Sequence, residues 1–131
     1  MSLYFAVFTE NDEELNGFQV GTYHDYGKFI ETVKENIESN FCSVLINHHD
    51  SDGCWSAQEC KVLIKELSHI KNELAKLPPN RIDYDWAKQN AYELGDSLNS
   101  SLQNVDGEPM ANALLSLCEL AVKNNAKLYF Q

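Results

Sequence analysis

The residues best suited to chemistry gather in one short segment near the middle of the chain. Imidazole, carboxylate and thiol groups can ligate metal ions or transfer protons in a catalytic site. Such a mixture of groups is compatible with a calcium loop, a zinc site or a catalytic centre. The members of the segment are His48, His49, Asp50, Asp52, Cys54, Glu59 and Cys60.

A calcium-binding loop of about twelve residues can be laid over this segment from His48 to Glu59. Asp50 and Asp52 then take the third and fifth positions, and Glu59 takes the last. The first position needs a carboxylate, because Ca²⁺ prefers oxygen ligands, but His48 occupies it. The same residues also fit a turn followed by a helix, in which Ser56 and Glu59 form a capping box. We therefore expect a structural turn here.

A structural zinc site normally contains close ligand pairs at two places, such as Cys-x-x-Cys or His-x-x-x-His. His48 or His49 could join Cys54 and Cys60, but these residues form no such pairs. Adjacent histidines at the end of a strand also point to opposite sides. We predict no bound metal and no cofactor. The alternative left open is a small metal-binding or hydrolytic domain that uses the turn from His48 to Asp52.

The sequence contains no clear pattern that is typical of a nucleophilic catalytic centre. Cys42, Cys54 and Cys118 stand among apolar residues, which disfavour a reactive thiolate, and we expect all the cysteines to be free thiols. No serine lies in a Gly-x-Ser-x-Gly elbow, and no glycine pattern could cradle a phosphate. His49 and Asp50 could exchange protons, but this pair is typical of many polar turns. We predict that the protein is not an enzyme.

The elements that must position these residues follow from local patterns. Alternating or continuous apolar runs predict strands, apolar positions three and four residues apart predict helices, and Pro78-Pro79 ends the longest helix. The pattern predicts an α/β (α+β) fold: one domain over residues 1–131, with a mixed sheet of about four to five strands packed against three to four helices. The expected strands are 3–9, 18–22, 41–46 and 128–130, and the expected helices are 25–39, 56–77, 84–94 and 109–123.

The charge of the chain is negative and unevenly distributed. The formal net charge is −10, and residues 1–55 carry ten acids against Lys28 and Lys34, whereas residues 56–131 carry ten acids against eight bases. This balance argues against nucleic-acid binding, which depends on cationic groups. No apolar run approaches the roughly 20 residues of a membrane span, and the first residues have no basic region typical of a secretion signal. We expect a cytoplasmic protein.

Several of these segments together resemble a known family. They are Leu45–Ser56 with its Asp-Gly and Trp-Ser pairs, Glu59-Cys60 with the leucine-rich helix, Asn104–Pro109, and the final Phe130-Gln131. This combination resembles the immunity proteins of bacterial polymorphic toxin and contact-dependent growth inhibition systems, most nearly the immunity protein 70 family. The resemblance covers residues 41–131.

The resemblance implies a protein that binds the C-terminal domain of a cognate toxin in the cytoplasm and thereby protects the producing cell. Such toxins are often nucleases with cationic active sites, which an acidic inhibitor would approach under electrostatic attraction. We expect a monomer or small oligomer that covers the active site of the toxin, with a self-associating regulatory module as an alternative. The candidate toxin contacts are Glu10, Asp12, Glu13 and Glu14 on the first loop, and Asp50 and Asp52 on the later turn.

Overall fold

Four strands form one antiparallel sheet in the computed structural model, which describes residues 2–48, 53–88 and 92–131. The order across the sheet is β2-β1-β4-β3. The two N-terminal strands pair as a hairpin, and the last strand of the chain pairs with β1. The bounds are β1 Ser2–Phe8, β2 Glu14–Thr22, β3 Cys54–Trp55 and β4 Lys127–Phe130.

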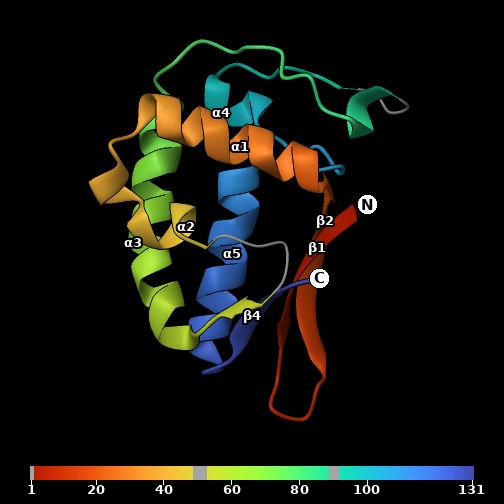
Figure 1. Ribbon diagram of the computed structural model, residues 1–131, viewed down its shortest axis with the longest axis vertical. Helices are drawn as coiled ribbons and strands as arrows, with labels where there is room; N and C mark the ends of the chain where they lie inside the picture. Colours follow the sequence, from red (N-terminus) through yellow and green to blue (C-terminus); the bar gives the residue numbers. More distant parts are fainter. Residues whose placement is uncertain (1, 49–52, 89–91) are drawn as a thin grey trace.

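The helices pack against one face of this sheet. Figure 1 shows α3 and α5 side by side, with α1 running across their upper ends. No helix in the described part of the chain is both long and apolar enough to cross a membrane. The α-helices are α1 Tyr23–Asn36, α2 Ser43–Ile46, α3 Ala57–Leu74, α4 Leu98–Ser101 and α5 Met110–Lys123, and the 3₁₀ turns are η1 Ser39–Phe41 and η2 Trp86–Lys88.

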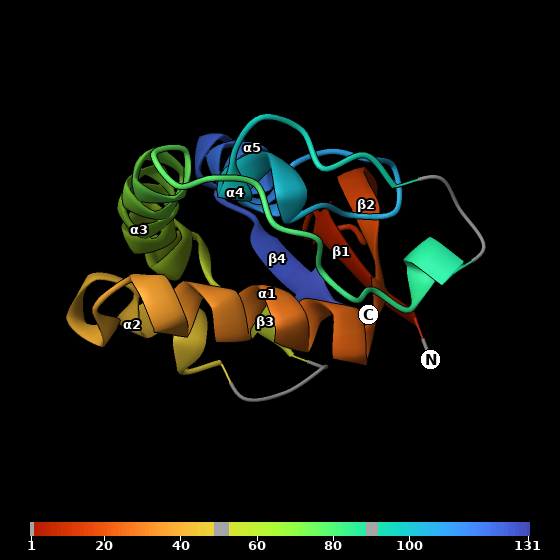
Figure 2. The same ribbon diagram turned by 90° about the horizontal axis from the view of Figure 1, so that it is seen from above.

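The core lies between the sheet and these helices. Along β1 the side chains of Leu3, Phe5 and Val7 are fully buried, because successive residues of a strand point to opposite faces and this set points toward the helices. Phe5 lies at the centre, and its ring centroid is 4.7 Å from that of Phe130 on β4. Trp55 stacks on the Phe5 ring and is 1% exposed, so it belongs to the core. In Figure 2, β1, β2 and β4 lie to the right of α3, and α5 and α1 lie above and below β4 in the view.

The α+β class with four strands is confirmed, and one detail of the sheet differs from the prediction. A mixed sheet was expected, but every pairing between the described strands is antiparallel. The chain enters β4 from α5 and runs back along β1, so the C-terminal strand is antiparallel to the N-terminal strand. Gln131 and Tyr4 each donate a backbone hydrogen bond of 2.8 Å to the carbonyl of the other.

Capping boxes define the starts of the two long helices α1 and α3. The predicted box at α3 is confirmed: the Ser56 hydroxyl accepts from the Glu59 amide at 3.1 Å, and the Glu59 carboxylate accepts from the Ser56 amide at 3.0 Å. The helix predicted to begin at residue 25 begins at Tyr23 instead: Thr22 is its N-cap, and Asp25 is the third helical residue of a second capping box.

The strand predicted for residues 41–46 is wrong. This segment forms the end of η1 followed by α2. Its buried residues are Cys42 and Leu45, whose spacing of three suits a helical turn. The cause lies on α3, where the carboxylate of Glu66 accepts hydrogen bonds from the amides of Val44 and Leu45 at 3.1 and 3.0 Å. A buried acid from a distant segment thus caps a short helix that local composition does not indicate.

The helix predicted for residues 84–94 is also wrong within the described residues, because only η2 forms there and Tyr92 to Leu94 are not helical. The segment is held by tertiary contacts instead: the Asp25 carboxylate accepts from the amides of Asp85 and Trp86 and so ties this part of the chain to the start of α1. Gly95, which follows this segment, has a φ of +73°, a left-handed conformation that suits glycine.

Candidate functional site

The four N-terminal acids predicted as contacts lie together at the turn of the β1–β2 hairpin. We call the segment Thr9–Glu14 the acidic turn, and Glu10, Asp12, Glu13 and Glu14 are all exposed in it. Thr9 organises the turn, since its hydroxyl accepts from the amides of Asn11 at 3.3 Å and Glu13 at 3.2 Å. The hairpin therefore brings these acids to one end of the molecule, where Figure 1 shows the turn extending past the lower ends of α3 and α5.

The charge of the acidic turn is not neutralised within the described part of the chain. None of its four carboxylates forms an ion pair with a described residue. Glu14 is the only one in a side-chain hydrogen bond with a described residue, as the Tyr4 hydroxyl donates to Glu14 Oε2 at 3.2 Å. Four acids within five residues therefore leave an uncompensated negative field that would attract a cationic partner.

The second predicted group of contacts, Asp50 and Asp52, lies outside the described residues, as does His49. The flanks of this turn are described. The His48 ring stacks on the Phe130 ring, with centroids 4.0 Å apart and an interplanar angle of 4°. Its Nδ1 atom is buried and has no hydrogen-bond partner among the described residues. The imidazole of His48 is thus part of the aromatic core at this edge of the sheet.

The four cysteines are free, as predicted, and Cys42, Cys60 and Cys118 are buried. Burial raises the pKa of the Cys42 thiol. Cys60 on α3 and Cys118 on α5 are hydrogen-bonded to each other, which raises the pKa of Cys118, with burial adding to the effect, and lowers that of Cys60. Cys60 and Cys118 therefore contribute to the packing of α3 against α5.

A cluster around the buried Asp25 was missed by sequence reasoning. Asp25 Oδ1 accepts from the Asp85 amide at 2.5 Å, and Oδ2 accepts from the amides of Thr22 at 2.9 Å and Trp86 at 3.3 Å. The Thr22 hydroxyl donates to Asp85 Oδ2 at 2.8 Å, and His24 Nδ1 lies 3.3 Å from the same oxygen. The only local signal was the Thr-x-x-Asp spacing of a capping box.

This cluster joins the end of β2 and the start of α1 to the segment at Asp85 and Trp86, and its hydrogen bonds give it a structural role. His24, Asp25 and Asp85 have potential ligand atoms within 4.8 Å of one another, which is the spacing a metal ion would need. However, the Asp25 carboxylate already accepts three backbone hydrogen bonds, and these account for its burial without an ion. The Thr22 hydroxyl, followed by His24 and Lys88, lowers the pKa of the Asp85 carboxyl.

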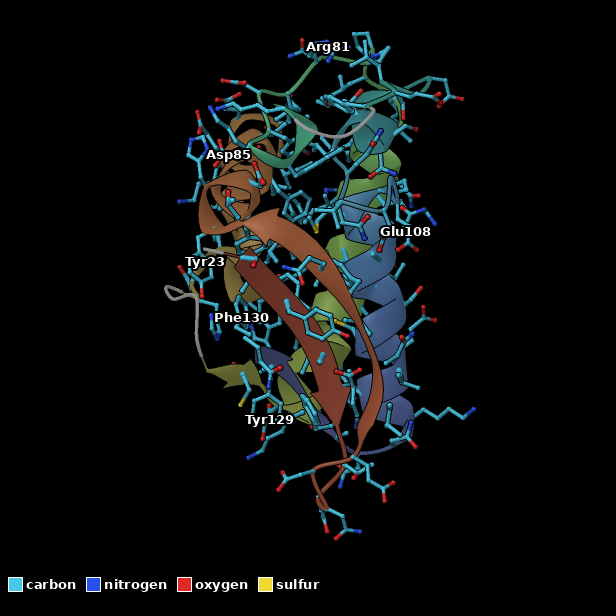
Figure 3. The ribbon with its side chains drawn as sticks, turned by 90° about the vertical axis from the view of Figure 1, so that its right-hand side faces the viewer. Tyr23, Arg81, Asp85, Glu108, Tyr129 and Phe130 are labelled. Carbon is cyan, nitrogen blue, oxygen red and sulfur yellow. The ribbon has the colours of Figure 1, made fainter. Side chains whose placement is uncertain are left out.

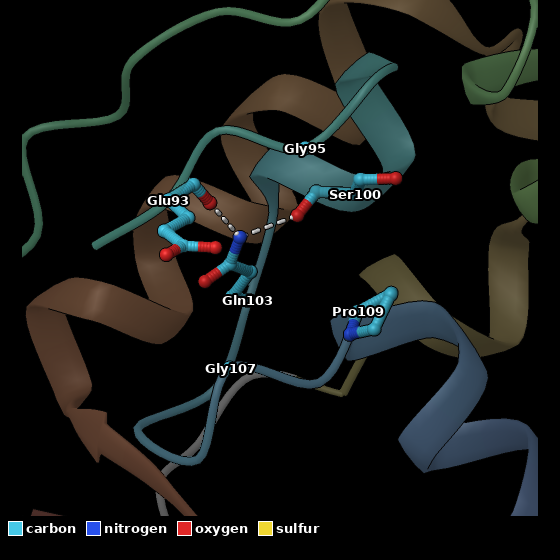
Figure 4. A pocket seen from close by; sticks show the side chains of 6 residues that line it. All are labelled: Glu93, Gly95, Ser100, Gln103, Gly107 and Pro109. Carbon is cyan, nitrogen blue, oxygen red and sulfur yellow. Dashed lines mark hydrogen bonds between the residues drawn. The ribbon is translucent and has the colours of Figure 1, made fainter. Parts of the chain in front are cut away.

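One surface hollow lies between α4 and the loop that leads into α5. Figure 4 shows its lining, in which Gln103 donates through Nε2 to the carbonyls of Glu93 and Ser100. The polar groups of this hollow are therefore used to join parts of the chain. Its lining residues are Glu93, Gly95, Ser100, Gln103, Gly107 and Pro109.

The Asp-Gly-Glu-Pro segment that contributed to the resemblance has a structural role. The buried Asn104 side chain accepts from the amides of Asp106 at 2.9 Å and Glu108 at 3.1 Å, and it donates to the Glu108 carboxylate. Gly107 takes a φ of +81°, which suits glycine. This motif therefore shapes the entry to α5.

Comparison with known proteins gave one finding. A family model described as immunity protein 70 matches residues 3–130, so the match extends through the N-terminal hairpin as well as the segments that carried the resemblance. No curated protein and no solved structure matches the chain.

Proposed function

Because the chain belongs to the immunity protein 70 family, we propose that it binds the C-terminal domain of a cognate toxin and blocks its active site. The toxin would be made beside this protein, and binding would take place in the cytoplasm of the producing cell. The inhibitor needs only to occupy the toxin, so no catalysis, cofactor or nucleic acid is required of it. The single observation that carries the family assignment is the match over residues 3–130.

The acidic turn supports a cationic toxin as the partner. Its four exposed carboxylates have no ion-pair partner among the described residues, so they remain free to pair with lysines or arginines of another protein. A nuclease active site presents such groups, because it binds the phosphates of its substrate. A nuclease is therefore the toxin class that best fits this charge. The acidic turn would compete with the nucleic acid for the same basic groups.

Steric occlusion would follow from the position of the turn. The hairpin extends beyond the helices, so its acids can enter a cleft that the body of the domain cannot (Figure 1). Asp50 and Asp52 remain proposed as additional contacts. Charge would speed the encounter, while the strength of the complex would rest on a few well-packed residues.

Co-expression tests this function directly. The C-terminal domain of the toxin encoded by the adjacent upstream gene is expressed in a bacterial host alone or together with this protein. We expect growth arrest by the toxin domain alone and restored growth when this protein is present. Continued growth arrest in the presence of folded, expressed protein would contradict the proposal, and so would the absence of toxicity from the upstream domain.

A matched pair of variants adds information on the acidic turn. Replacing Glu10, Asp12, Glu13 and Glu14 by their amides should weaken protection at low expression. The control makes the same change in charge at four exposed acids on other segments, Glu31, Glu35, Glu38 and Asp83. Equal protection by both variants would remove the acidic turn from the mechanism without affecting the family assignment.

A further inference from the structure

The sheet has an outer face, turned away from the helices, that carries aromatic side chains. Since Phe5 and Val7 point into the core, Tyr4, Ala6 and Phe8 of β1 point outward. The register pairs Ala6 with Tyr129 of β4, which therefore shares this face. Figure 3 looks onto it: β1 and β2 lie in front, α3 and α5 lie behind them, and Tyr129 is labelled at the lower edge. We call Tyr4, Phe8 and Tyr129 the outer aromatic cluster.

The outer aromatic cluster is ordered by its neighbours. The rings of Phe8 and Tyr129 meet edge-on, with centroids 5.7 Å apart and an interplanar angle of 76°. All three cluster residues are partly exposed, whereas Ala6 between them is fully buried. Aromatic side chains in such a fixed arrangement provide a large contact area and lose little conformational entropy on binding.

Gly17 of β2 makes room for the Tyr4 ring. It pairs with Ala6, and a Cβ atom at this position would lie 2.6 Å from the Tyr4 hydroxyl oxygen and 2.7 Å from its Cε2 atom. The absence of a side chain lets the ring cross β2 and donate to Glu14 at the start of the strand. The outer aromatic cluster and the acidic turn are therefore one continuous surface.

A second observation marks the same end of the sheet as a surface for a partner. Leu15 is 38% exposed and is one of three large hydrophobic side chains that stand out in the described residues, with Phe41 and Val62. It lies beside Glu14 at an irregularity in the pairing between β1 and β2. Such irregularities often redirect side chains near functional sites. An exposed apolar side chain thus lies next to the acids at the hairpin end.

We propose that the outer aromatic cluster is the anchor of the toxin interface, and that its occupant is a basic protein surface. This inference rests on the proposed function and assigns it a surface. Arginine or lysine side chains of the toxin stack on Tyr4, Phe8 and Tyr129 through cation–π contacts while their neighbours pair with Glu13 and Glu14. Aromatic residues dominate the energetics of interfaces, and acids beside them select for positive charge.

Lys127 tests the predicted charge of the occupant. It is exposed and pairs with Phe8 across β1 and β4, so it is the base nearest the cluster in the register. With a basic toxin surface, Lys127→Glu should raise the association rate constant several-fold. The matched control Lys61→Glu, on the exposed side of α3, should change it by less than about twofold. A slower association for Lys127→Glu would overturn the basic occupant.

Binding of variants to the catalytically inactive C-terminal domain of the upstream toxin tests the anchor. Phe8→Ala and Tyr129→Ala should each raise the Kd about tenfold or more, chiefly through faster dissociation. Phe41→Ala is the control, because Phe41 is 49% exposed on η1, away from the sheet. We expect it to change the Kd by less than about threefold. Comparable effects at all three positions, or none, would overturn the anchor.

Hydroxyl-radical footprinting of the wild-type protein gives a result that does not depend on the folding of variants. On binding the toxin domain, oxidation of Tyr4, Phe8 and Tyr129 should fall while that of Phe41 stays unchanged. Unchanged oxidation of the cluster in a formed complex overturns this surface but leaves the proposed function standing. If the wild-type protein forms no complex with the toxic domain, the proposed function itself fails, and the surface fails with it.

Discussion

At the scale of single residues, the buried carboxylate of Asp25 joins two parts of the chain that are far apart in sequence. It accepts backbone hydrogen bonds from Thr22, Asp85 and Trp86 and so fixes the loop after α3 to the start of α1. Hydrogen bonds to a charged acceptor contribute more than neutral ones, and removing the acceptor leaves buried donors without partners. The conformation of the loop at Asp85 and Trp86 therefore depends on the side chain of Asp25, which lies outside that loop.

We predict that Asp25→Ala lowers the free energy of unfolding by about 3 kcal/mol, because buried donors lose a charged acceptor. The measurement is urea-induced unfolding followed by tryptophan fluorescence. Asp83→Ala, which removes an exposed acid from the neighbouring loop, should stay within about 0.5 kcal/mol of the wild type. Similar losses in the two variants would show that Asp25 does not hold the loop.

Asp85 provides a pH-dependent prediction at the same scale. Its carboxyl pKa lies below the ordinary 3.8, first because the Thr22 hydroxyl donates to it and then because His24 and Lys88 lie nearby. A carboxyl with a depressed folded pKa stabilises the fold above the unfolded pKa, and this contribution is lost as the pH falls through the lower folded value. The loss of this stabilisation should therefore occur only at pH values below about 4.

An NMR titration of the side-chain carboxyl carbon of Asp85 would measure this pKa. We expect Thr22→Val to raise it toward the ordinary value and His24→Ala to raise it less, because the hydroxyl is the larger cause. A larger rise in His24→Ala would show that charge rather than the hydrogen bond sets the titration of Asp85.

At the scale of elements, Glu66 explains why α2 exists. Its carboxylate, 7% exposed, reaches from α3 to the amides of Val44 and Leu45. We predict that Glu66→Ala lowers the free energy of unfolding by about 2 kcal/mol, and that hydrogen exchange of the Val44 and Leu45 amides becomes faster. The control Lys65→Ala, at the adjacent exposed position, should change neither quantity appreciably. Unaltered exchange in Glu66→Ala would contradict this role.

Sequence patterns predicted the elements whose causes are local. The capping box of Ser56 and Glu59, the leucine stripe of α3 and the first loop with its four acids all depend on residues close in the chain. The helix at 43–46 could not be predicted, because its cap comes from Glu66, about twenty residues away. The loop at 84–88 was missed for the same reason, since Asp25 holds it.

The candidate surface was predictable in part. The acidic turn follows from composition, because four acids lie within five residues between two strands. The outer aromatic cluster depends on which strand pairs with β1 and in which register, and only the structure places Tyr129 beside Ala6. The fit of Tyr4 over Gly17 likewise needs the pairing of β1 with β2.

At the scale of the whole molecule, the net charge of −10 should affect how fast the protein meets its partner. We predict that the association rate constant with the toxin domain falls about tenfold between roughly 10 mM and 150 mM salt, because ions screen the attraction. Stopped-flow fluorescence measures this rate. The variant with amides at Glu10, Asp12, Glu13 and Glu14 should associate more slowly and depend less on salt. A rate that does not change with salt would exclude electrostatic attraction.

Also at the scale of the whole molecule, the stoichiometry of inhibition distinguishes an inhibitor that binds its target from an enzyme that modifies it. An inhibitor is consumed in a stoichiometric complex, whereas an enzyme would inactivate many toxin molecules in turn. Membership of the immunity protein 70 family favours the first mode.

A titration of purified toxin domain with increasing amounts of this protein decides between these modes. The residual toxin activity is measured after a fixed incubation at concentrations well above the Kd. We predict a straight decline that reaches zero at one molar equivalent and does not change with longer incubation. Activity that survives an excess of folded protein, or that disappears over time with far less than one equivalent, would contradict inhibition by binding.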